Sequence, residues 1–313
     1  MSILTSAHAR QARRRSALPA VALAVLIAAG LAFTTPGAFS AQNIVNLLNQ
    51  QSSVMSVTLG QTLVILAGGF DLSVGSVVSL TTAILSLEIH PLAAFALALG
   101  SAFLVGLANA VGIVRFRIHP ILMTISTMTI VQGAALLLRP IPGGTVPAGL
   151  VAYANGTLFG LPLPIYAMVV LVLLTSLLLG GTRFGLHVYA VGGSPENAAL
   201  GGVRAARVVG ACYVLSALFA CLGGINLAAR IASGDPLVGA SFAIDSVAAT
   251  ALGGTLLSGG MGSIGGSVAG VAVLALLANG LNFWNVSTHF QMLIKGALLI
   301  AAVSAHRRAA PGL

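Results

Sequence analysis

Charge is scarce in this chain of 313 residues: Asp, Glu, Lys and Arg together make up 6% of it, and only five residues are acidic. Hydrophobic residues make up 58%. No soluble domain stays in solution with that composition, so the shortage of charge predicts a polytopic membrane protein built of α-helices. The net charge of +9 does not indicate nucleic-acid binding, because the basic residues lie in short segments between apolar runs.

Cysteine and lysine are also rare. Cys212 and Cys221 lie in one apolar run without metal-ligand spacing, and we interpret them as small core residues rather than a disulfide. The one lysine, Lys295, belongs to no phosphate-binding loop, and the six histidines form no metal-binding pattern. The sequence therefore predicts no catalytic residue, no metal and no bound cofactor. It indicates a protein that moves a solute, not an enzyme.

Long apolar runs recur along the chain, as in proteins that cross a membrane many times. We predict ten spans, at residues 18–33, 53–67, 72–88, 92–114, 120–138, 163–179, 208–229, 242–257, 264–281 and 289–303. Residues 1–17 and 306–313 are then terminal tails, and residues 18–305 form the transmembrane domain. The first run also fits a secretory signal peptide cleaved near residues 38–40, but the many runs that follow favour a spanning helix.

Three longer segments separate some of these runs. Residues 35–52 are rich in Asn and Gln and predict an external loop or a short surface helix. Residues 139–161 are rich in Pro and Gly and predict an external loop, and residues 180–207 form a second polar stretch. Lys295 lies inside the last predicted span, where it either snorkels or pairs with a polar group.

The arginines indicate an orientation. Ten spans place both termini on one side, and we assign that side to the cytoplasm. The external segments then hold only Arg139 and Arg230, as the positive-inside rule requires. The cytoplasmic arginines are Arg10, Arg13, Arg14, Arg15, Arg115, Arg117, Arg183, Arg204, Arg207, Arg307 and Arg308.

Residues 68–75 place an acidic residue, Asp71, between two long apolar runs. A carboxylate at the centre of a spanning helix costs about 2.5–3.5 kcal/mol. The surrounding glycines allow irregular backbone, which a membrane tolerates only against protein or a water-filled cavity. We interpret Asp71 as the N-cap of a helix starting at Leu72, with Ser73 in its first turn, and that role is compatible with fixing a gate.

Glycine-rich links occur in both halves of the chain, at residues 68–75 and 253–266. Spans two to five and spans seven to ten would run in opposite orientations, which is typical of an inverted repeat in transporters. The simpler explanation is that the glycines allow close helix packing.

Three motifs, in order, resemble those of bacterial ABC-transporter permeases for monosaccharides, the ribose, xylose and galactose type. Residues 68–76, GGFDLSVGS, resemble that family's GGIDLSVGS. Residues 192–203, GGSPENAALGGV, resemble its cytoplasmic loop GGNPEAARLSGI, and residues 252–266 resemble its GGTSLSGGRGSVIGT segment. The resemblance covers about residues 18–305. The chain departs from the pattern at Asn197, Gly201 and Met261, and Met261 replaces a usual Arg.

The resemblance implies an importer in the bacterial inner membrane. Two copies of the permease would form the pathway, two ATP-binding subunits would drive it, and a periplasmic binding protein would deliver the sugar. The loop at residues 192–203 would dock into the ATPase, and an ordinary surface loop is the alternative. The residues assigned to coupling are Gly193, Pro195, Glu196, Ala198, Ala199 and Gly202.

A neutral sugar needs hydrogen-bonding groups along its route but no strong charge. Polar residues within or beside the predicted spans fit that requirement, although hydrogen bonds between helices, worth about 0.6 kcal/mol each, also explain any one of them. The candidate pathway residues are Gln61, Thr62, Asp71, Ser73, Asn109, Thr124, Gln132 and Asn279.

Two other functions stay open. A permease of the same architecture would carry a branched-chain amino acid, a nucleoside or another small solute. An ion-coupled secondary transporter needs carboxylates buried in the membrane. Because Asp71, Glu88 and Asp245 all lie at the ends of predicted spans, the sequence favours a passive pathway gated by a partner.

Overall fold

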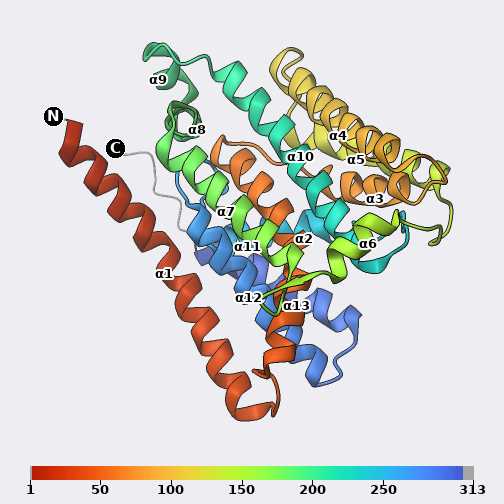
Figure 1. Ribbon diagram of the computed structural model, residues 1–313. Helices are drawn as coiled ribbons and strands as arrows, with labels where there is room; N and C mark the ends of the chain where they lie inside the picture. The colour runs from red at the N-terminus through yellow and green to blue at the C-terminus, as the bar shows by residue number, and fades with distance from the viewer. Residues whose placement is uncertain (1, 306–313) are drawn as a thin grey trace.

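The computed structural model describes residues 2–305, with side chains described from residue 17 to residue 304 (Figure 1). The described chain is helical apart from connections and one hairpin of two-residue strands. Its elements are α1 Ser2–Thr34, α2 Ala41–Leu66, α3 Val74–Leu85, α4 Pro91–Val114, α5 Pro120–Leu138, α6 Ala148–Asn155, β1 Thr157–Leu158, β2 Leu161–Pro162, α7 Leu163–Gly181, α8 Arg183–Gly193, α9 Pro195–Leu200, α10 Ala205–Ile231, α11 Phe242–Leu252, α12 Ile264–Phe283 and α13 Thr288–Ala305.

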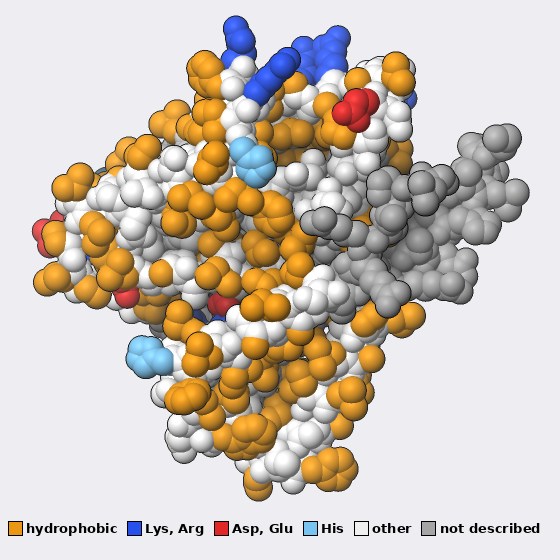
Figure 2. Space-filling view, turned by 180° about the vertical axis from the view of Figure 1, so that it is seen from behind, with side chains coloured by type: hydrophobic (Ala, Val, Ile, Leu, Met, Phe, Trp, Pro, Cys, Tyr) orange, Lys and Arg blue, Asp and Glu red, His pale blue; other side chains and the backbone are white. Residues whose placement is uncertain are grey.

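Six helices of the described chain are long and apolar enough to cross a membrane: α1 from Ala17, α4, α5, α7, α10 and α12. Their outward side chains are apolar, as shown by Leu104 on α4 and Leu177 on α7, which are 63% and 65% exposed. Figure 2 shows apolar side chains over most of one face of the molecule, with Lys and Arg gathered mainly at one end. A surface of this kind suits lipid, and the protein is a multi-pass membrane protein.

Helices α2 and α10 form the centre of the bundle, and α10 also packs along α3 and α4. Glycines bring these helices close together. A β-carbon on Gly60 of α2 would lie 2.9 Å from the Cα of Ser216, and one on Gly106 of α4 would lie 2.7 Å from the Cα of Val214. Small residues at such crossings let the backbones approach closely. Van der Waals packing then holds the helices together, because no hydrophobic driving force acts between helices in lipid.

Helices α3 and α11 are shorter than the spans predicted at residues 72–88 and 242–257. They contain 12 and 11 residues, and at 1.5 Å per residue both are under about 20 Å long. A hydrocarbon core of about 30 Å is too thick for either to cross alone. Every residue of α3 is buried, so protein rather than lipid surrounds this short helix.

The two halves of the bundle share one order of helix lengths. Helices α2 to α5 contain 26, 12, 24 and 19 residues, and helices α10 to α13 contain 27, 11, 20 and 18. The packing also corresponds: α3 contacts α4, α5 and α10, while α11 contacts α12, α13 and α2.

Several segments expected to be loops or tails contain helix. Helix α2 begins at Ala41, because the Ser40 side chain caps it, so most of residues 35–52 extends the second span. Residues 139–161 contain α6 and β1, and residues 180–207 contain α8 and α9. Helix α1 begins at Ser2, within the predicted N-terminal tail, and the predicted tail at residues 306–313 lies outside the described residues.

Candidate functional site

Three glycine-rich segments that are distant in sequence meet at one place. They are the end of α2 (residues 66–69), the end of α8 (residues 192–193) and the connection between α11 and α12 (residues 258–260). We call this contact the glycine junction. Each segment belongs to a different one of the three motifs found in the sequence, so the motifs form one structural unit.

Backbone atoms make the contacts in the glycine junction. The amide of Gly260 donates a hydrogen bond to the carbonyl oxygen of Leu66, with an N–O distance of 3.0 Å. A β-carbon on Gly259 would lie 2.8 Å from the Cα of Gly68, and one on Gly260 would lie 2.7 Å from the Cα of Gly193. At Gly192, Gly259 and Gly260 no side chain fits, so the three segments pack backbone against backbone.

Two observations explain why these positions are glycine. Gly68, Gly259 and Gly260 have φ of +88°, +93° and +75°, the left-handed region that side chains disfavour. A methyl group on Gly192 would overlap the carbonyl oxygen of Leu66.

The coupling residues predicted from the sequence lie beside the glycine junction, on and around α9. Ser194 caps α9 by accepting a hydrogen bond from the Asn197 amide at 3.2 Å, and Pro195 occupies the first turn, where no amide donor is needed. Glu196 is exposed and accepts a hydrogen bond from the Ser194 hydroxyl at 3.2 Å.

The other predicted coupling residues divide by burial. Gly193, Ala199 and Gly202 are exposed, whereas Ala198 is buried and holds α9 against the body of the protein. Gly202 reverses the chain after α9 with φ of +81°. The short helix is therefore anchored on one face and open on the other.

Sequence reasoning missed Leu200, the last residue of α9. Its side chain is 88% exposed, although the chain around it is not an apolar span. The only signal in the sequence was a single leucine inside a polar connection. A hydropathy value averaged over neighbouring residues does not reveal it. An exposed leucine beside Glu196 gives α9 both an apolar and an acidic contact group.

Asp71 lies at the start of α3 and is completely buried. Its Oδ1 atom accepts two hydrogen bonds, from the amide of Ser73 at 3.0 Å and from the hydroxyl of Ser73 at 2.6 Å. Asn109 of α4 donates from its side chain to the same hydroxyl at 2.9 Å. Helix α3 begins at Val74, two residues later than expected, and its N-cap position is Ser73, which makes no side-chain capping bond, so the prediction that Asp71 is the N-cap is wrong. Asp71 instead holds the turn before the helix through Ser73, and the Ser73 hydroxyl links that turn to α4.

Replacing Asp71 separates its hydrogen bonds to Ser73 from its charge. Asp71→Asn keeps an oxygen that accepts from Ser73, so transport should stay close to wild type, whereas Asp71→Leu should lower the free energy of unfolding by about 0.5–2 kcal/mol and reduce transport. Thermal unfolding and solute uptake of both variants measure the difference. Wild-type transport in both variants would reduce the motif to a packing feature.

The predicted pathway residues Gln61 and Thr62 lie in the core of α2, with no exposed surface. The Thr62 hydroxyl lies 2.8 Å from the Ser267 hydroxyl and 3.3 Å from that of Thr250, which links α2 to α12 and α11. Both polar atoms of the Gln61 side chain are buried without a hydrogen-bond partner among the described residues.

The remaining pathway candidates lie in different places. Thr124 donates to the carbonyl of Pro120 at 3.0 Å within α5. Gln132 donates to the carbonyl of Pro236 at 2.7 Å, which fastens the loop before α11. Only Asn279 of the predicted pathway residues borders the polar cavity described below. Among the described residues, no three His, Cys, Asp or Glu side chains gather closely enough to hold a metal ion.

Comparison with known proteins places the chain in a family. Residues 43–303 match the family model described as branched-chain amino acid transport system / permease component. No solved structure gives a significant match.

The similar named proteins are sugar permeases. Ribose import permease protein RbsC of Bacillus subtilis (strain 168) is 35% identical, with 85% of each chain covered. The protein of that name in Escherichia coli (strain K12) is 34% identical over 90% of this chain and 91% of its own. The L-arabinose ABC transporter permease protein AraH of Azospirillum brasilense is 31% identical over 89% and 84%.

The family model covers most of the chain, and each of these relatives aligns along nearly its whole length. The close glycine contacts explain why the three motifs occur together in this chain. The chain therefore belongs to the permease family of ABC importers, in its monosaccharide group.

Proposed function

We propose that this protein is the membrane-spanning subunit of an ATP-driven importer for a monosaccharide such as ribose. The observation that carries the proposal is the 34% identity to a ribose import permease over 90% of this chain. The bundle supports it, because its polar groups are mainly neutral hydrogen-bonding side chains, which suit a solute covered in hydroxyls.

The partners follow from the same proposal. Each of two ATP-binding subunits docks on the α9 of one permease copy, where Leu200 and Glu196 are exposed beside the glycine junction. A second copy of the permease completes the pathway, and a periplasmic sugar-binding protein delivers the sugar at the opposite end.

Native mass spectrometry of the purified importer should give two permeases and two ATPase subunits, and a single permease would contradict this stoichiometry.

Uptake of labelled sugar tests the function. Cells that lack their own ribose permease should take up ribose when they express this chain with its partner subunits, and should not take up leucine by this route. Glu196→Lys should abolish uptake while the permease still reaches the membrane, because the substitution reverses the charge on α9. Uptake of leucine instead of any monosaccharide would overturn the proposed substrate class.

We also propose that the chain crosses the bacterial inner membrane ten times, with both termini in the cytoplasm. Eight spans are α1, α2, α4, α5, α7, α10, α12 and α13, and the other two are α3 and α11, each together with the non-helical backbone beside it. The basic residues support this orientation. Arg115 and Arg117 lie in the α4–α5 connection, Arg204 lies in the α9–α10 connection, and Arg207 lies in the first turn of α10. Both connections are at the same end of the bundle (Figure 1).

Labelling of single cysteines checks this topology. Thr145 and Asn197 are both exposed and lie on opposite sides in the proposed arrangement. A membrane-impermeant thiol reagent should label Thr145→Cys in intact cells and Asn197→Cys only after the membrane is opened. Labelling of both variants from outside would refute the topology.

The matching helix lengths and contacts of α2–α5 and α10–α13 support a further proposal, an inverted repeat. In a structure of the assembled importer, α2–α5 and α10–α13 should superpose after a twofold rotation about an axis in the membrane plane. If the two sets do not superpose, there is no inverted repeat, and close helix packing explains the glycine-rich links at residues 68–75 and 253–266.

A further inference from the structure

A polar cavity of about 220 Å³ lies between α2, α10, α11, α12 and α13. It is smaller than the roughly 300–1,000 Å³ of pockets for drug-sized ligands, which suits a smaller molecule. Amide and charged side chains supply much of its lining, among them Gln50, Gln51, Asp245, Asn279, Asn282 and Lys295.

The cavity faces one side of the proposed membrane arrangement. Its lining comes from the first half of α2, the end of α10, the beginning of α11, the end of α12 and the first half of α13. All five parts are external in the proposed topology. Farther along α2, the contacts of Thr62 with Ser267 and Thr250 and then the glycine junction close the bundle on the cytoplasmic side.

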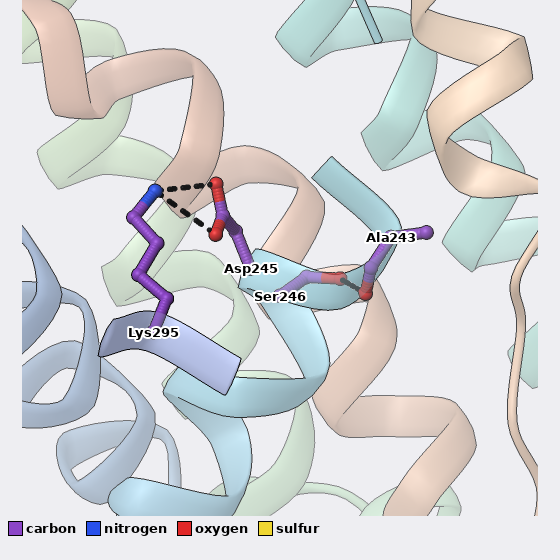
Figure 3. Close-up of polar contacts among 4 residues, drawn as sticks. All are labelled: Ala243, Asp245, Ser246 and Lys295. Carbon is purple, nitrogen blue, oxygen red and sulfur yellow. Dashed lines mark hydrogen bonds and ion pairs between the residues drawn. The ribbon is translucent and has the colours of Figure 1, made fainter. Parts of the chain in front are cut away.

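An ion pair forms part of the cavity wall. The Nζ atom of Lys295 on α13 lies 3.1 Å from both carboxylate oxygens of Asp245 on α11, and the two side chains point toward each other across the gap between these helices (Figure 3). Their neighbours Ile244 and Met292 are apolar and exposed. Because isolated charges are costly in lipid, the pair indicates a water-filled space rather than a lipid contact.

The lining chemistry discriminates between solutes. Asn and Gln side chains each carry a donor and an acceptor, as the hydroxyls of a sugar require. Asn279 already exchanges two hydrogen bonds with Asn43, so a sugar would compete with Asn43 for that amide. Asp245 is the only acidic residue that lines the cavity within the described chain, and Lys295 already engages both of its oxygens. Arg230 also lines the cavity and adds a second positive charge to it. The ammonium group of an amino acid would therefore meet no carboxylate that is open to it.

We propose that this cavity is a binding site for a monosaccharide inside the permease, occupied on the external side before the bundle opens inward. The inference rests on the proposed function and adds the location and the contacts of the sugar.

The site can be tested with the permease in membrane vesicles. A bound sugar should protect a cysteine placed in the cavity from a thiol reagent. Ala278 lines the cavity, and the native Cys212 and Cys221 are buried, so Ala278→Cys gives a specific signal. Ribose should slow the reaction of this cysteine with an impermeant thiol reagent severalfold, whereas leucine should not. Gln50→Ala, added to Ala278→Cys, should raise the ribose concentration for half-protection about fivefold, as loss of one hydrogen bond predicts.

Gln42 provides the matched control. It lies on the same helix as Gln50, is exposed, and bonds to Asn46 rather than lining the cavity. Gln42→Cys should react at the same rate with and without ribose, and Gln42→Ala should not change the protection of Ala278→Cys.

If no imported sugar slows the labelling of Ala278→Cys, the proposed site is wrong. The proposed function would still stand if the wild-type importer takes up the sugar. Protection by leucine instead of ribose would overturn both.

Discussion

Gly192→Ala is expected to abolish uptake and to destabilise the permease by about 3 kcal/mol, at the upper end of the usual cost of overpacking. The added methyl group would overlap the carbonyl oxygen of Leu66 and lie 2.6 Å from the amide of Gly260. These are the two groups that form the hydrogen bond across the glycine junction. Because both are backbone atoms, no rotation of a side chain relieves the overlap, and α8 must move away from α2.

Thermal unfolding of the purified permease and sugar uptake measure this effect. Gly180→Ala is the matched control, because Gly180 lies in α7 with no atom within 4 Å of the added carbon. Alanine is a better helix former than glycine, so the control should be as stable as wild type or slightly more so. Equal stability and uptake in the two variants would show that the glycine junction is looser than described.

Lys295→Met is expected to be the second most damaging change. It leaves the Asp245 carboxylate without its partner beside an apolar helix face. Removal of one partner from a fully buried pair costs about 3–5 kcal/mol. The side chains of Lys295 and Asp245 keep 24% and 13% of their surface exposed, so water reaches them and we expect a loss of about 2 kcal/mol.

A double-mutant cycle separates the pair from other effects of the substitutions. Asp245→Asn with Lys295→Met removes both charges and should recover most of the stability lost in Lys295→Met. Asp245→Asn alone should be milder than Lys295→Met, because a lysine ammonium can reach water at the end of its flexible side chain. Thermal unfolding of the three variants gives the coupling energy, and additive losses would mean that the pair contributes nothing.

Helix positions were largely predictable where apolar runs end at strong local signals. Helices α4, α5 and α7 begin and end within two residues of the predicted spans. A proline marks each start: it is the first residue of α4 and of α5, and it directly precedes α7. Helices α3 and α11 were predicted too long. Apolar residues occur beyond the ends of these helices, so hydropathy does not mark the ends. Contacts with the rest of the protein decide where each helix ends.

The candidate site was predictable in part. Residues 192–203 stood out as a motif, and the exposed face of α9 is consistent with that interpretation. Leu200 was missed, because exposure of one residue has no signature in the sequence. The polar residues of the spans were found as a set, yet Gln132 and Asn279 lie in separate places and Thr62 lies inside the core.

The sequence by itself determined the membrane class, the long helices and the three family motifs, because hydropathy, proline and glycine act over a few neighbouring residues. Only the tertiary structure decided that residues 66–69, 192–193 and 258–260 touch, and that Lys295, which the sequence left to snorkel or to pair, bonds to Asp245. These contacts depend on the direction and depth at which whole helices pack. That arrangement is set by many close approaches together, such as Gly60 against Ser216, and no single stretch of sequence specifies it.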